Sequence, residues 1–187
     1  MKPLLNATLL FLLLVIGFSG VVSGQDEADF YETKRLAERG LAFAQVNLGL
    51  MYDLGEGVPG NDAEAVRWYG LAAEQGNALA QTNLGLMYAN GEGIPQNNAR
   101  AYMWWSVAAE QGNALAQTNL GLMYATGEGV PQNNARAYMW WSVAAAQGNE
   151  SARDNRDIVA ERLAPDQLAR GQDMATRCFE SDYQDCE

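Results

Sequence analysis

An internal repeat of 36 residues constrains the fold of this chain more than any other feature of its sequence. Residues 78–113 and 114–149 are nearly identical, and a more diverged copy occupies residues 42–77. The only differences between the two closest copies are Asn90 against Thr126, Ile94 against Val130 and Glu110 against Ala146. A unit of this length cannot bury its own apolar face and has to stack on neighbouring units. The chain is therefore expected to form a stack of similar units.

Each unit is predicted to hold two helices joined by a tight turn. In residues 78–113, Asn77 is placed to cap a helix from Ala78 to Ala89. Gly91 follows, at a position where a left-handed residue commonly ends a helix. A second helix is expected after Asn97 or Asn98, running to about Glu110 before Gly112. The third unit repeats these signals at Asn113, Gly127, Pro131, Asn133 and Gly148.

Helical spacing indicates which side chains form the core. On the first helix, Ala80, Leu84 and Tyr88 recur at four-residue intervals, with Gly85 beside them for close helix approach. On the second helix, one face consists of Ala101, Trp104, Trp105 and Ala108. Small and large side chains that alternate in this way allow paired helices to interdigitate. An aromatic stripe could also hold a ligand, but its identical recurrence in each repeat favours a core.

These positions resemble the Sel-one-like repeat (SLR) family, a relative of the tetratricopeptide repeat. The residues that carry the resemblance are Ala80, Leu84, Gly85, Tyr88, Gly91, Gly93, Ala101, Trp104, Ala108, Ala109 and Gly112, with their equivalents 36 residues away. The resemblance covers residues 42–149 and implies an all-α fold, a right-handed α/α solenoid of tandem 36-residue helix-turn-helix repeats with capping helices. Trp105 and Trp141 stand where the family usually has Tyr, and Val107 and Val143 replace a common basic residue. The outer face is therefore unusually apolar.

The two ends of the chain differ from the repeats. Residues 1–24 are typical of a signal peptide, with Lys2, an apolar run and small residues before Gln25. Residues 25–41 align with a second helix and are expected to form an N-terminal capping helix. Residues 150–187 are expected to form C-terminal capping helices, one of them opened by Pro165, and an acidic tail.

Two cysteines stand in that tail. Cys178 and Cys186 are the only cysteines of the chain, and in an exported protein they suit a disulfide. Free thiols or intermolecular pairing are the alternatives. We expect export without a stable membrane anchor, to the periplasm first and the extracellular space second.

Composition excludes several classes of function. The chain has no histidine, which removes Ser-His-Asp and Cys-His nucleophile systems and histidine-ligated zinc. Its net charge of −11 would repel nucleic acid and anionic lipid surfaces. We expect no enzyme, no cofactor and no metal site. A monomer is favoured.

The favoured hypothesis is a protein-protein interaction scaffold, which the SLR resemblance also implies. In helix-pair solenoids the first helices line the concave face, where this chain repeats Asn, with amide groups for a partner's backbone, and Leu for apolar contact. The predicted partner-binding residues are Asn47, Leu50, Leu79, Asn83, Leu86, Asn90, Leu115, Asn119, Leu122 and Thr126. A solvated face with incidental leucines is an equal alternative. The convex face around Met103, Val107, Met139 and Val143 is another.

Two further hypotheses belong to other classes. Some secreted SLR proteins are described as binding or hydrolysing β-lactams, but their mark is a cysteine pair in every repeat, which these repeats lack. A carbohydrate-binding envelope component would need exposed tryptophans, which the core accounts for better.

Overall fold

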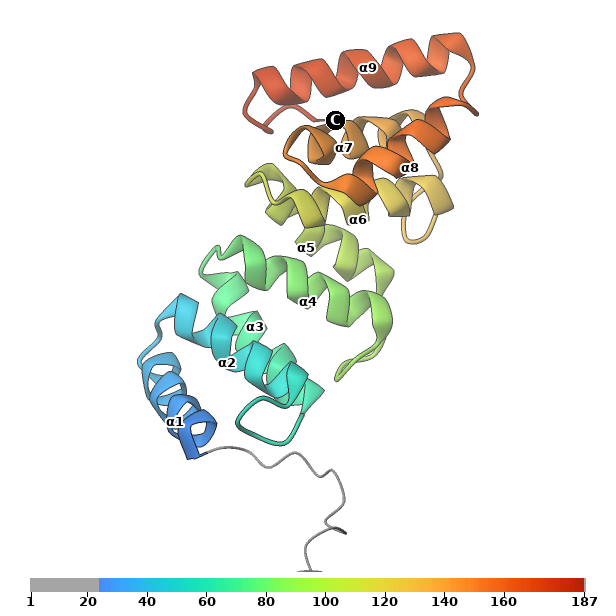
Figure 1. The fold of residues 1–187 in the computed structure, drawn as a ribbon. Helices are drawn as coiled ribbons and strands as arrows, with labels where there is room; N and C mark the ends of the chain where they lie inside the picture. Colours follow the sequence, from blue (N-terminus) through green and yellow to red (C-terminus); the bar gives the residue numbers. More distant parts are fainter. Residues whose placement is uncertain (1–23, 187) are drawn as a thin grey trace, which may run out of the picture.

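The computed structural model describes residues 24–186, and within them the chain is all-α. The helices are α1 (Gly24–Glu38), α2 (Ala42–Leu54), α3 (Asp62–Glu74), α4 (Ala78–Asn90), α5 (Asn98–Glu110), α6 (Ala114–Thr126), α7 (Asn134–Ala146), α8 (Glu150–Ala160) and α9 (Pro165–Glu180). They stack in order from α1 at one end to α9 at the other (Figure 1). The predicted solenoid of paired helices is confirmed. The predicted signal peptide lies almost wholly outside the described residues.

Capping side chains set the helix boundaries within each repeat. The Asn77 side chain accepts a hydrogen bond from the Ala80 amide at 2.9 Å, and Asn97 accepts one from the Arg100 amide at 3.0 Å. Asn97, rather than Asn98, is therefore the cap of α5. Gly91 adopts the left-handed conformation, with φ of 79°, and its amide donates to the Met87 carbonyl at the end of α4. The cap residues alone thus account for the ends of these helices.

A glycine and a tryptophan join the two helices of a repeat. A Cβ atom on Gly85 of α4 would lie 2.5 Å from the indole nitrogen of Trp105, so only glycine admits the ring. That indole N–H donates to the Thr82 carbonyl at 3.0 Å. The third repeat has the same arrangement, with the Trp141 indole N–H donating to the Thr118 carbonyl at 3.1 Å. The indole N–H groups of Trp105 and Trp141 are therefore satisfied inside the core.

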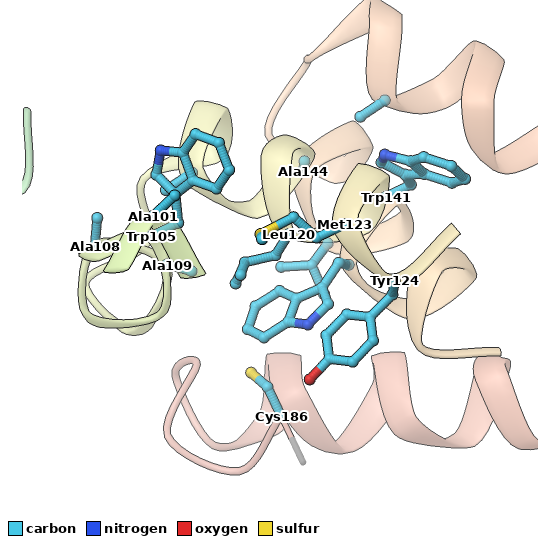
Figure 2. Packing of buried hydrophobic residues seen from close by; sticks show 14 of the residues in the cluster. Ala101, Trp105, Ala108, Ala109, Leu120, Met123, Tyr124, Trp141, Ala144 and Cys186 are labelled. Carbon is cyan, nitrogen blue, oxygen red and sulfur yellow. The ribbon is translucent and has the colours of Figure 1, made fainter. Parts of the chain in front are cut away.

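The two tryptophans of the second repeat differ in burial. Trp105 is 5% exposed, whereas Trp104 is half-buried at the edge of the core. Trp104 packs against the core, as the helical spacing predicts, but it is more exposed than Trp68 and Trp140 at the equivalent positions, which are both buried. Figure 2 shows Leu120 and Met123 of α6 between Trp105 and Trp141. The core is thus continuous from one repeat to the next.

Buried glutamines join neighbouring repeats. The side-chain amide of Gln81 in α4 donates to the Ala73 carbonyl at the end of α3, at 3.2 Å. Its carbonyl oxygen accepts from the Gln111 side chain at the end of α5, at 2.7 Å. Gln45 and Gln117 make the same pair of contacts one repeat earlier and one repeat later. In each repeat, one glutamine side chain therefore forms hydrogen bonds both with the last helix of the preceding segment and with the end of the repeat's own second helix.

The last helix departs from the repeat pattern. α9 begins at Pro165, as predicted, and packs against α7. In Figure 1 it lies across the end of the stack. The chain then turns back, and a disulfide joins Cys178 of α9 to Cys186, both of them buried. The acidic tail is thus held against the body of the molecule.

Candidate partner-binding surface

The candidate surface is built from one face of the first helix of each repeat. On α2 this face holds positions 43, 47, 50 and 54, whose spacing of four, three and four residues places them on one side of a helix. The same positions recur 36 residues later on α4 and 72 residues later on α6. We call this surface the first-helix face. It includes every predicted partner-binding residue.

The leucines of the first-helix face are open to solvent in the structure. The exposed fractions are 47% for Leu79, 42% for Leu86, 49% for Leu115 and 51% for Leu122. Leu50 is half-buried, because it packs against the core cluster. Buried residues such as Leu84 and Leu120 occupy the opposite side of the same helices. The structure therefore places four of the predicted leucines on one accessible surface, whereas Leu50 lies partly in the core.

The first-helix face is longer than the sequence analysis predicted. Phe43 occupies the position of Leu79 and is 57% exposed, and Leu54, at the end of α2, is 64% exposed. At the other end, Ile158 of α8 occupies the position of Leu86 and is 50% exposed, with Asn155 at the position of Asn83. Asn155 and Ile158 were missed because α8 lacks the core motif of a repeat. The signal was present, since the 36-residue register continues unbroken into α8.

The asparagines of this face differ in their surroundings. Asn47 and Asn90 are exposed, whereas Asn83 and Asn119 are half-buried. The Asn83 side chain hydrogen-bonds to the Tyr69 hydroxyl, which itself donates to the Asp53 carboxylate at 3.1 Å. Burial and the neighbouring Asp53 raise the pKa of Tyr69, so it stays a neutral donor. Asn83 thus has a structural partner already.

Two polar residues at the ends of these helices are also engaged locally. The Asn90 side chain donates to the Glu92 carboxylate at 3.3 Å. The Thr126 hydroxyl donates to the Leu122 carbonyl at 3.0 Å and accepts from the Glu128 amide at 3.3 Å. Both side chains are exposed, so a partner that approaches them meets groups that already have hydrogen bonds within the chain.

A row of carboxylates borders the first-helix face. Glu56, Glu92 and Glu128 occupy the same position in the turns that follow α2, α4 and α6, and all of them are exposed. With a net charge of −11, the chain as a whole has the same sign. An apolar stripe with an acidic border favours a partner that combines apolar and basic side chains.

Only the α5 part of the alternative convex surface is exposed in the structure. Met103 and Val107 of α5 are exposed, at 48% and 39%. Met139 and Val143 of α7 are wholly buried, which corrects the expectation that they belong to an open face. The cause is α9, which packs against α7 and has no counterpart on α5.

Residues 24–186 contain neither a candidate metal site nor a helix that could span a membrane. No group of His, Cys, Asp or Glu in this part of the chain is arranged to hold a metal ion. None of the helices described there is both long and apolar enough to cross a membrane.

Comparison with known proteins identifies the repeat and the fold. The family model described as Sel1 repeat matches residues 42–77, 78–113 and 114–149, more than half of the chain. A protective antigen of uropathogenic Escherichia coli with an SLR fold is 38% identical, with a TM-score of 0.70, and covers 72% of this chain. A Sel1 repeat protein from Oxalobacter formigenes is 31% identical, with a TM-score of 0.70, and covers 81%. The chain spans only 29% and 62% of these two proteins. No curated protein matches it.

Proposed function

The chain belongs to the Sel1 repeat family, and we propose that it is an exported scaffold that binds a protein or peptide partner along the first-helix face. The proposal includes that the chain binds and does not catalyse. Sel1 repeats typically mediate protein interactions, which supports the general class. The specific surface rests on the observations that follow.

One observation carries the proposal: exposed apolar side chains recur at equivalent positions along four successive first helices, at the Leu79 position in α2, α4 and α6 and at the Leu86 position in α4, α6 and α8. Single exposed leucines are ordinary on a protein surface, but a contiguous apolar patch marks an interaction site. Here the exposed residues are Phe43, Leu54, Leu79, Leu86, Leu115, Leu122 and Ile158. Exposed leucines add little to folding, so their recurrence favours a role in binding. A partner with a matching apolar stripe would bury several of them at once.

Site-specific photo-cross-linking tests where the partner lies. A photoreactive amino acid at Asn47, which is exposed on the first-helix face, should capture the partner in cells of the source organism. The same amino acid at Gln172, exposed on α9, is the matched control and should capture nothing specific. Capture from Gln172 alone would place the site elsewhere and contradict the proposal.

The captured partner then allows a quantitative test. Leu86→Ala and Leu122→Ala should each weaken binding by about 1.5–3 kcal/mol, because each removes an apolar side chain that the partner buries. Asn119→Ala should cost less, about 1 kcal/mol, as one neutral hydrogen bond is lost. The melting temperature of the leucine variants should stay near that of the parent, since these side chains are exposed. Early melting would assign the leucines to folding instead.

Export is supported by the composition of residues 1–24 and by the disulfide between Cys178 and Cys186, a bond that persists in oxidising compartments. Intact-mass measurement of the protein recovered from the periplasm should show the loss of about 24 residues. A full-length mass would contradict cleavage.

A further inference from the structure

α5 and α7 have almost the same sequence, but their outer faces differ in exposure. The two helices differ only at their last residue, Glu110 in α5 and Ala146 in α7. Met103 and Val107 of α5 are 48% and 39% exposed. Their equivalents Met139 and Val143 are 0% exposed. One copy of this surface is therefore open, and the other is occupied.

The occupant of the α7 surface is α9. The buried side of α9 consists of Gly171, Met174, Ala175 and Cys178. A Cβ atom on Gly171 would lie 2.9 Å from the Tyr138 ring and 3.0 Å from the Ala135 carbonyl, so the two helices are in close contact there. Ala135 is 8% exposed, whereas its equivalent on α5, Ala99, is exposed. The occupant is thus an amphipathic helix with small residues at the point of contact.

The segment that follows α9 contacts the end of α5, and the equivalent place one repeat earlier is unoccupied. The Gln184 side chain donates to the Glu110 carbonyl at 3.0 Å, and the Tyr183 ring lies against Gly112. One repeat earlier, the equivalent residues are Glu74 and Gly76. A Cβ atom on Gly76 would meet nothing within 4 Å, so this place is bare. We call the surface that α9 and the following segment occupy the seat of α9. The seat recurs one repeat toward the N-terminus, on the outer face of α5 and at Glu74 and Gly76, and the chain's own tail contacts it only at the end of α5, at Glu110 and Gly112.

The chain's own α9 cannot fill the second seat, because it is fixed to α8 by the short segment 161–164 and already occupies α7. We propose that the outer face of α5 binds an amphipathic helix of a partner protein, placed on α5 as α9 is placed on α7. The apolar side of that helix carries small residues and a methionine or similar side chain. This site lies on the second helices and is independent of the first-helix face.

Charge defines the partner helix further. Glu110 stands where α7 has Ala146, and Glu74 lies at the same position one repeat earlier, both exposed. Gln167 and Arg170 of α9 lie near the start of α7, and the tail reaches the end of α5, so α9 runs in the same direction as these helices. The C-terminal end of a helix bound in this way lies near Glu110. Basic residues there suit both the glutamates and the helix dipole.

A synthetic peptide tests the site directly. The probe has the sequence of residues 165–180 with Cys178→Ala and blocked ends, and a second probe adds Asp173→Lys and Glu180→Lys. Methyl-labelled methionines of the disulfide-bonded protein report the location. The Met103 methyl signal should shift in a saturable manner, while the Met139 and Met174 signals stay unchanged. The basic probe should bind roughly 2- to 5-fold more tightly than the native one, as for exposed charge pairs.

Two variants complete the test. Val107→Asp places a charge on the seat and should weaken binding about ten-fold or more, because a buried apolar contact is lost. Leu86→Asp, on the first-helix face, is the matched control and should bind the probe as the parent does. Three results would overturn the proposal: no Met103 shift at millimolar probe, shifts at Met139 and Met174 that show displacement of the chain's own α9, or equal loss of binding in both variants.

Discussion

At the scale of single residues, the contact between Gly85 and Trp105 explains why small and large residues alternate in the repeat. The indole ring fills the space that the missing side chain leaves, and its N–H binds a helix carbonyl. Gly85 cannot change while the ring is present, because any Cβ atom at position 85 meets it. The pair recurs as Gly121 with Trp141, while the first repeat uses Gly49 with Tyr69. The ring differs between repeats, but the glycine is constant, since the separation of the two helices depends on it.

Adjacent tryptophans give a matched test of this account. Trp105→Ala should lower the free energy of unfolding by about 3–5 kcal/mol, because it empties a closed site between two helices. Trp104→Ala should cost clearly less, since Trp104 is half-buried and part of its space opens to solvent. Chemical denaturation followed by circular dichroism measures both. Equal losses would mean that Trp104 is as central to the core as its neighbour.

The buried glutamines allow a second test at this scale. Gln117→Leu keeps much of the volume but leaves the Ala109 carbonyl without the amide that donates to it at 3.1 Å. The expected loss is about 1–3 kcal/mol, the cost of an unsatisfied buried polar group. Gln132→Leu is the matched control, because Gln132 is exposed and its hydrogen bond to the Ala125 carbonyl, at 2.7 Å, lies in an exposed place where water can replace it. A Gln117→Leu protein as stable as the parent would show that the glutamines do not hold neighbouring repeats together.

At the scale of helices, the position of α9 depends on Gly171. Gly171→Ala places a methyl group against the Tyr138 ring and the Ala135 carbonyl, and the backbone carbonyl cannot move aside easily. We expect α9 to separate from α7 and expose Met139 and Val143, with faster amide hydrogen exchange confined to α7 and α9. Gly70→Ala is the control. Nothing lies within 4 Å of a Cβ atom at Gly70 in α3, so this change should stabilise the chain by about 0.5–1 kcal/mol. Unchanged exchange in the Gly171 variant would contradict the role assigned to it.

How far the sequence predicts each helix depends on how local the determining contacts are. The ends of α4 and α5 follow from Asn77, Gly91 and Asn97, because caps act within one turn. The exposed leucines of the first-helix face follow from helical spacing and the repeat. The burial of Met139 does not, since its sequence surroundings match those of the exposed Met103. Only the packing of a distant, non-repeating helix distinguishes them. Repetition therefore predicts the interior of the stack better than its ends.

At the scale of the whole molecule, the interface between one repeat and the next recurs with the same side chains, because the sequence repeats. α4 and α6 differ only at their last residue, so α3 can pack against either with the same side chains. The glutamine contacts recur in the same way, because Gln81 and Gln117 each bond to the alanine carbonyl eight residues before them. In such a solenoid, stability is close to a sum of units and of interfaces between neighbours.

Removal of one whole unit tests this additivity. Deletion of residues 78–113 joins Asn77 to Ala114, which restores an asparagine cap before α6 and places Gln117 opposite the Ala73 carbonyl. The C-terminal tail then meets Glu74 and Gly76 in place of Glu110 and Gly112. We therefore expect a folded, disulfide-bonded protein with a lower melting temperature, because one unit and one interface are lost. Deletion of residues 78–95 removes α4 and its turn alone, leaves α5 without its partner helix, and should unfold the chain. Circular dichroism during heating measures both, and an unfolded product of the 36-residue deletion would show that the stability of the stack depends on contacts beyond nearest neighbours.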